Sequence, residues 1–217
     1  MLSFPSSTEV NKRIPKQRFY EHVSITPAVK RLFVEQVDSI YWLNKISTIT
    51  TNLQPGSGVT EVEIFELRLN SPELDEAVLR VIDGGIPYHI LFLLRYGEQC
   101  QLCTAYKEIT GGKVSLRRYY RGPWQSAEAL SLRLEGATTD EVYENLVRSV
   151  AGGGLQEKRE GENFAQAVSR EEKRAALQKK LDKLERMTRK EIQPKKKFEL
   201  YQQVQAIKKE IEAIHNS

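Results

Sequence analysis

Hydrophobic and polar positions along the first two thirds of the chain predict several strands with a few helices between them. The most apolar stretch, residues 86–107, divides at Gly97 into two runs of strand length, which is typical of an antiparallel hairpin. Residues 59–69 alternate between apolar and polar types with a break near Phe65, which indicates a half-buried strand with a bulge. Further strands are predicted over 39–50 and 113–124.

Helix signals flank these strands. A helix is predicted over 27–36, because Thr26 can cap free backbone N–H groups and Pro27 suits the first turn. By the same reasoning Ser71 begins a second helix, which ends before a glycine pair. A helical turn over 7–14 and a helix from residue 139 to the glycines at 152–154 complete the set. The predicted fold class is α+β, with a mainly antiparallel sheet and helices on one side.

A heptad pattern replaces this arrangement near the end of the chain. Leu177, Leu181 and Leu184 are spaced four and three residues apart, and Pro194 then interrupts the pattern. The same spacing resumes afterwards at Leu200, Val204, Ile207, Ile211 and Ile214. Two such helices with a short turn between them predict a coiled-coil-like helical hairpin.

The glycine-rich, charged stretch before the heptads predicts a linker, and a capping-box pattern from Ser169 to Glu172 marks the start of the hairpin. The predicted domains are therefore a globular domain over 1–151, a linker over 152–168 and a helical hairpin over 169–217. The pattern leaves open whether the heptads pair within one chain or between chains, as in an oligomer.

Charge is distributed unevenly along the chain. Residues 1–150 hold 17 Lys and Arg against 18 Asp and Glu, whereas residues 151–217 hold 16 against 11. At 100° per residue, four cations of the first heptad helix share one face opposite the leucines, and three more extend it across the turn. These residues are Lys179, Lys183, Arg186 and Lys190, followed by Lys195, Lys196 and Lys197. They are candidates for binding phosphate groups or an acidic protein, and the alternative is a solvated coiled-coil face.

A second candidate lies in the strand predicted over 113–124, where charged and aromatic residues are interleaved. It consists of Arg117, Arg118, Tyr119, Tyr120 and Arg121. Mixed surfaces of this kind suit single-stranded nucleic acid, whose bases can stack on the rings. The alternative is cross-strand packing of the tyrosines beneath the arginine stems.

Catalytic, metal and cofactor sites are not predicted. Cys100 and Cys103 form a lone C-x-x-C within a strand pattern, which favours packing over redox or zinc chemistry. A metal-dependent nuclease with a degenerate site is a further alternative. Lys107 would supply its lysine and Glu61, Glu63 and Glu66 its carboxylates, although Ala105 stands where an acid belongs. No apolar run approaches the ~20 residues of a membrane span, and a cytoplasmic location is expected.

Two segments carry a family resemblance. The stretch from Ile86 to Lys107 and the segment Ile40 to Ser47 resemble the bacterial family known as domain of unknown function 4391, over about the first two thirds of the chain. The resemblance implies a setting beside DNA methyltransferases and helicases of restriction-like or phage-defence loci. It assigns no residue a role.

These observations together favour a non-catalytic accessory subunit. Its helical hairpin is expected to dock a larger partner and to add phosphate contacts. The methyltransferase or helicase class of that partner comes from the resemblance alone. The alternative is a protein that binds DNA or RNA directly through the basic helix face and the Arg-Tyr strand.

Overall fold

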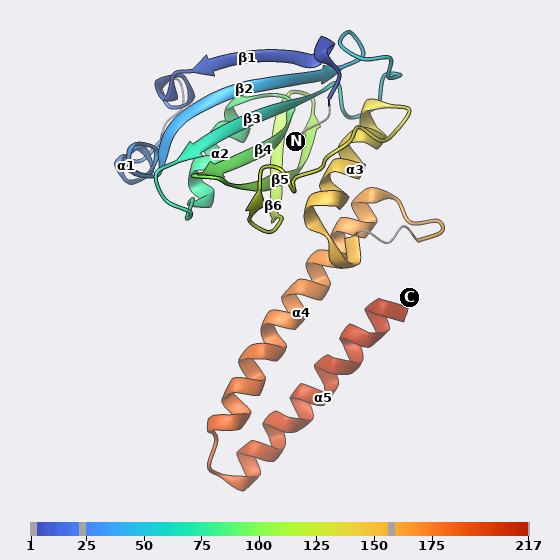
Figure 1. Cartoon of the computed structure of the whole chain (residues 1–217). Helices are drawn as coiled ribbons and strands as arrows, with labels where there is room; N and C mark the ends of the chain where they lie inside the picture. Colours follow the sequence, from blue (N-terminus) through green and yellow to red (C-terminus); the bar gives the residue numbers. More distant parts are fainter. Residues whose placement is uncertain (1–3, 22–24, 156–158, 217) are drawn as a thin grey trace. The chain divides into compact units, whose positions relative to one another are not determined.

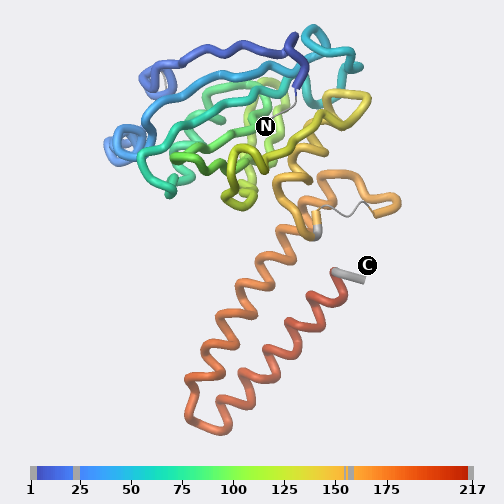
Figure 2. The backbone as a smooth tube through the Cα atoms, viewed as in Figure 1, coloured from blue at the N-terminus to red at the C-terminus, as the bar shows by residue number. Residues whose placement is uncertain are grey.

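The computed structural model describes residues 4–21, 25–155 and 159–216. The chain forms two compact units, one over Met1–Gln156 and one over Glu157–Ser217. Figures 1 and 2 show a curved sheet with its helices in the first unit and two long antiparallel helices in the second. Among the described residues, no helix is long and apolar enough to cross a membrane.

A seven-stranded sheet forms the core of the first unit, with six strands in the order β1-β2-β3-β4-β5-β6 and β7 paired to β5. Neighbouring strands run antiparallel except β3 and β4, which are parallel and are joined by the helix α2. A parallel pair needs such a crossover, because a tight turn reverses the chain. The strands are β1 (Glu9–Ile14), β2 (Val37–Ser47), β3 (Glu61–Leu69), β4 (His89–Tyr96), β5 (Gln99–Thr110), β6 (Lys113–Arg121) and β7 (Gln125–Ser126).

Helices pack on both faces of this sheet. α1 (Pro27–Gln36) and α2 (Glu76–Gly85) cover one face, where Phe33, Phe65 and other large side chains form a buried core. α3 (Thr139–Ala151) lies on the opposite face. There the ring centroids of Tyr143 and His89 lie 4.2 Å apart, and the Tyr143 hydroxyl donates to the carbonyl of Ala105 in β5. The predicted α+β class with a mainly antiparallel sheet is confirmed, and α3 adds a helix on the second face.

The capping residues in the sequence predicted the start of α1 correctly but not the start of α2. α1 spans the predicted residues, and the Thr26 hydroxyl accepts from the N–H of Val29 as expected. α2 begins later than predicted, because Asp75 is its cap while the Ser71 hydroxyl donates to a carbonyl within the preceding turn. The predicted turn over 7–14 was wrong beyond Thr8, since β1 begins at the next residue.

The predicted bulge also lies elsewhere. The register between β2 and β3 shifts between Trp42 and Asn44, so the extra residue is Leu43 of β2, opposite the position where β3 was expected to bulge. An extra residue lets two consecutive side chains turn toward the same side of a sheet. Leu43 and Asn44 both line the cavity described below.

The second unit is a helical hairpin formed within one chain. α4 (Phe164–Lys190) and α5 (Pro194–Asn216) bury a seam made of Leu181, Leu184, Val204 and Ile207. The helix starts five residues before the predicted cap at Ser169, because Asn163 and Gln166 form the capping box. The predicted linker over 152–168 is therefore too long at its end, where residues 164–168 are helical.

Candidate functional site

The four cations predicted to share a face of α4 do so. Lys179, Lys183, Arg186 and Lys190 line one shallow groove together with Met187, and all four are exposed. Within the described residues, none of the four has an acidic partner. By contrast, Glu185 on the same helix pairs with Arg189 and with Lys208 of α5. We call Lys179, Lys183, Arg186 and Lys190 the basic stripe.

The end of the hairpin carries a second surface that the heptad analysis missed. Large apolar side chains are exposed there to an unusual degree, 90% for Ile192, 61% for Phe198, 53% for Tyr201 and 45% for Met187. Lys195, Lys196 and Lys197 lie among them and are exposed as well. We call residues 187–201 the hairpin tip. The sequence contains a signal for this surface. Phe198 and Tyr201 lie three residues apart and outside the heptad positions, so their apolar side chains face solvent on one side of the helix.

The side chains of the Arg-Tyr strand candidate, which is β6 in the structure, contact other parts of the first unit. Tyr119 and Tyr120 are buried, and the Tyr119 hydroxyl donates to the carboxylate of Asp83. The arginines have internal contacts too: Arg117 lies near Glu108, Arg118 over the Tyr120 ring, and Arg121 against the carbonyl of Leu74. This geometry favours the packing alternative, since neither tyrosine offers a free ring for a base.

Lys107, the lysine considered for nuclease chemistry, is enclosed instead at the end of α2. Its Nζ lies 2.7 Å from the carbonyl oxygen of Asp83, 2.6 Å from that of Ile86, 2.6 Å from that of Tyr88 and 3.3 Å from the Asp83 carboxylate. Burial lowers the pKa of Lys107 and raises that of Asp83. Because the ammonium has four acceptors and Asp83 also accepts from Tyr119, we treat the pair as ionised and structural.

The carboxylates of β3 do not converge. Glu61 and Glu63 lie on the face that holds Phe65, whereas Glu66 points to the other side, because successive strand residues alternate. Glu66 accepts from the Nε atoms of Arg68 at 2.7 Å and Arg95 at 3.1 Å. In the described part of the chain, no group of three His, Cys, Asp or Glu is placed to hold a metal ion. The arrangement therefore gives the nuclease alternative no support.

Cys100 and Cys103 are separated by the sheet. Cys103 belongs to the core under α1 and α2, and Cys100 lines the cavity on the opposite face. Both thiols are free and buried, and burial raises the pKa of Cys103 to about 12. Thiols in this position remain protonated at neutral pH, which suits packing.

Glu63 gives the fold a pH dependence. Its carboxylate is buried beside Glu61 and accepts from the indole of Trp42 at 2.6 Å. Desolvation raises its pKa from 4.5 to about 7, against the effect of that hydrogen bond. Folding therefore takes up a proton between these values. The contribution to stability is fully present below pH 4.5 and is lost as the pH rises through about 7.

We expect Glu63→Gln to remove this dependence. The glutamine stays neutral, so its stability should exceed that of the wild type increasingly as the pH rises from 5 to 9. Urea unfolding across this range measures the difference, with the exposed Glu73→Gln as the matched control. Parallel curves for the wild type and Glu63→Gln would contradict the prediction.

The fold is that of an α+β domain followed by a helical hairpin. The chain belongs to the family described as a domain of unknown function (DUF4391), whose family model matches residues 2–211. That match extends through both units, so the hairpin is part of the family's domain. No curated protein and no solved structure matches the chain.

Proposed function

We propose that this protein is a non-catalytic accessory subunit that docks a larger partner through its helical hairpin. The hairpin tip supplies the apolar contacts, and the neighbouring cations supply contacts to acidic groups. We take the partner to be a DNA-modifying or helicase-type enzyme, the class that the family resemblance implies.

The exposed side chains of the hairpin tip carry this proposal. Phe198, Tyr201, Met187 and Ile192 occupy one end of a hairpin whose seam is already filled by other residues. Tyrosine, phenylalanine and methionine are enriched at the centres of protein interfaces, where they fill pockets on the partner. Leaving them in water forgoes the stabilisation that burial would give, so a partner surface accounts for their position.

The positive charge of the hairpin tip indicates that the partner's surface carries acidic groups. Lys195, Lys196 and Lys197 are exposed, directly precede Phe198 in α5 and have no acidic partner among the described residues. A partner with an apolar pocket and an acidic rim would complement both features. Affinity capture from the native host tests the proposal by comparing the intact chain with Phe198→Asp/Tyr201→Asp.

A second candidate function is direct binding of nucleic acid through the basic stripe. The observation that favours it is that four exposed cations share one face of α4 without neutralising acids in the described residues. Cations so arranged attract a phosphate backbone and release its counterions. The interaction would carry little sequence preference, because phosphate contacts do not read bases.

A salt titration separates this candidate from apolar docking. If the stripe makes about four phosphate contacts, log K should fall with log salt at a slope of about −3 to −4, whereas apolar docking should change little. Lys183→Gln/Arg186→Gln should reduce that slope by about 2. The matched control is Arg189→Gln/Lys208→Gln, which removes the same charge from cations already paired with Glu185. Equal slopes for the two double variants would contradict a specific role for the stripe.

A further inference from the structure

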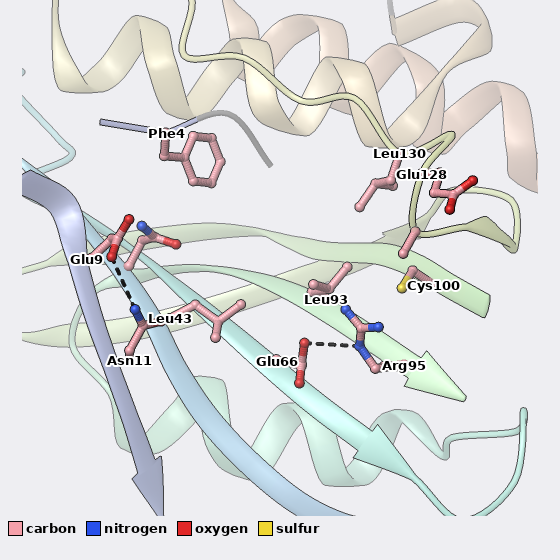
Figure 3. Close-up of a pocket in the computed structure, with 12 residues that line it drawn as sticks. Phe4, Glu9, Asn11, Leu43, Glu66, Leu93, Arg95, Cys100, Glu128 and Leu130 are labelled. Carbon is pink, nitrogen blue, oxygen red and sulfur yellow. Dashed lines mark hydrogen bonds and ion pairs between the residues drawn. The ribbon is translucent and has the colours of Figure 1, made fainter. Parts of the chain in front are cut away.

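The face of the sheet opposite α1 and α2 contains a cavity of about 560 Å³. Its volume lies in the range of small-molecule sites. Strands β2, β3, β4 and β5 supply its floor, and the segments around Phe4 and Leu130 border it from above (Figure 3). Apolar side chains make up much of its lining, with Leu43, Leu93 and Leu130 among them.

A charged cluster lies in the floor of this cavity. Glu66 is buried, and its two oxygens accept from different arginines, Arg68 and Arg95. Arg68 also lies over the ring of Tyr41 and does not line the cavity. Arg95 does line it, and Figure 3 shows its guanidinium beside Glu66 and Leu93. The floor therefore presents the Glu66 carboxylate and the Arg95 guanidinium, and Arg68 contacts Glu66 from outside the cavity.

The contact with Glu66 uses only one N–H donor of Arg95, the one at Nε. Its Nε donates to Glu66, so the edge formed by its two Nη atoms remains without a partner among the described residues. A guanidinium held at Nε is fixed in orientation, and its Nη edge matches the two oxygens of a carboxylate. Glu66 acts here as a positioning residue, since its own charge is already balanced by two arginines.

We propose that this cavity binds a small organic carboxylate. The anionic group pairs with the Nη edge of Arg95, and the apolar body lies against Leu43, Leu93 and Leu130. Nothing in this assignment depends on the hairpin or on its partner.

The rim of the cavity limits the charge of the ligand. Glu9 and Glu128 line it at exposed positions, and Glu9 also accepts from the side chain of Asn11. Two rim carboxylates repel a ligand with a second negative charge more than one with a single charge. The cavity should therefore favour monocarboxylates over dicarboxylates and phosphate esters.

Calorimetry with the full chain tests the assignment. The probes are 4-phenylbutyrate and octanoate, each compared with its own carboxamide, which keeps the shape and removes the charge. We expect both acids to bind with dissociation constants in the millimolar range or tighter, and the amides to bind at least about tenfold more weakly. Equal binding of acids and amides, or no binding by either acid in this range, would overturn the proposal.

Two substitutions place the binding at Arg95. Arg95→Gln should weaken the acids at least about tenfold and leave the amides unchanged, because only the charged contact is lost. Arg95→Lys keeps the charge but not the pair of Nη donors, so it should weaken acid binding by an intermediate factor. This variant tests the assignment if Arg95→Gln does not fold. The control is Arg118→Gln on β6, outside the cavity. Unchanged acid affinity in the folded Arg95 variants would overturn the proposal.

Discussion

Lys107→Met is expected to destabilise the first unit by about 3–5 kcal/mol. The substitution keeps the length and apolar character of the side chain but removes the ammonium that Asp83 and three backbone carbonyls contact. An unpaired carboxylate would then remain buried, and the last carbonyls of α2 would lose their donor. Urea unfolding at neutral pH measures the loss.

Two further variants test whether the loss of stability comes from the missing ammonium group. Lys113→Met changes an exposed lysine at the start of β6 and should alter stability by less than about 0.5 kcal/mol. Asp83→Asn combined with Lys107→Met should recover part of the loss, because it removes the stranded charge. A loss as small for Lys107→Met as for Lys113→Met would show that the lysine does not hold α2 to the sheet.

Phe198→Asp/Tyr201→Asp is expected to abolish capture of the partner by the hairpin. Central aromatic residues of an interface often contribute 2 kcal/mol or more each, so loss of both should weaken binding at least about a hundredfold. Both side chains are exposed and lie outside the seam, so the hairpin itself should stay folded. Capture from the native host, quantified by mass spectrometry, measures the loss, and circular dichroism checks the helices.

A matched control separates this result from a general loss of surface hydrophobicity. Ile49 is 88% exposed and lies in the first unit, so Ile49→Asp introduces the same kind of change away from the hairpin. It should leave capture intact. Equal capture by the wild type and the hairpin tip variant would contradict docking by this surface.

Strong local patterns made much of the fold predictable. The hairpin of β4 and β5 followed from an apolar stretch broken by a turn, and the helical hairpin from its heptads. β1 was missed because it is an edge strand with mostly exposed, polar side chains, so no alternation marks it. The start of α2 was misplaced because Ser71 and Asp75 are both competent caps, and local sequence does not choose between them.

Some features of the candidate sites follow from local sequence, and others depend on contacts between distant segments. The basic stripe depends on one helix period, so the sequence could predict it. The pairing of Glu66 with Arg95 depends on the parallel register of β3 and β4, which no local signal encodes. The sequence did not indicate that Lys107 is buried, because its acceptors come from the end of α2 and the residues after it, far from Lys107 in the sequence. Long-range pairing therefore limits what the sequence alone predicts about the cavity and the buried charges.

Photocrosslinking from the hairpin tip measures whether this surface contacts a partner protein. A photoreactive phenylalanine analogue replaces Tyr201 in one full-length variant and Ile49 in another, and each is irradiated in the native host. We expect one dominant crosslinked protein from position 201, lost when Phe198→Asp is added, and none above background from position 49. Crosslinks of equal yield from both positions, or none from position 201, would contradict docking by the hairpin.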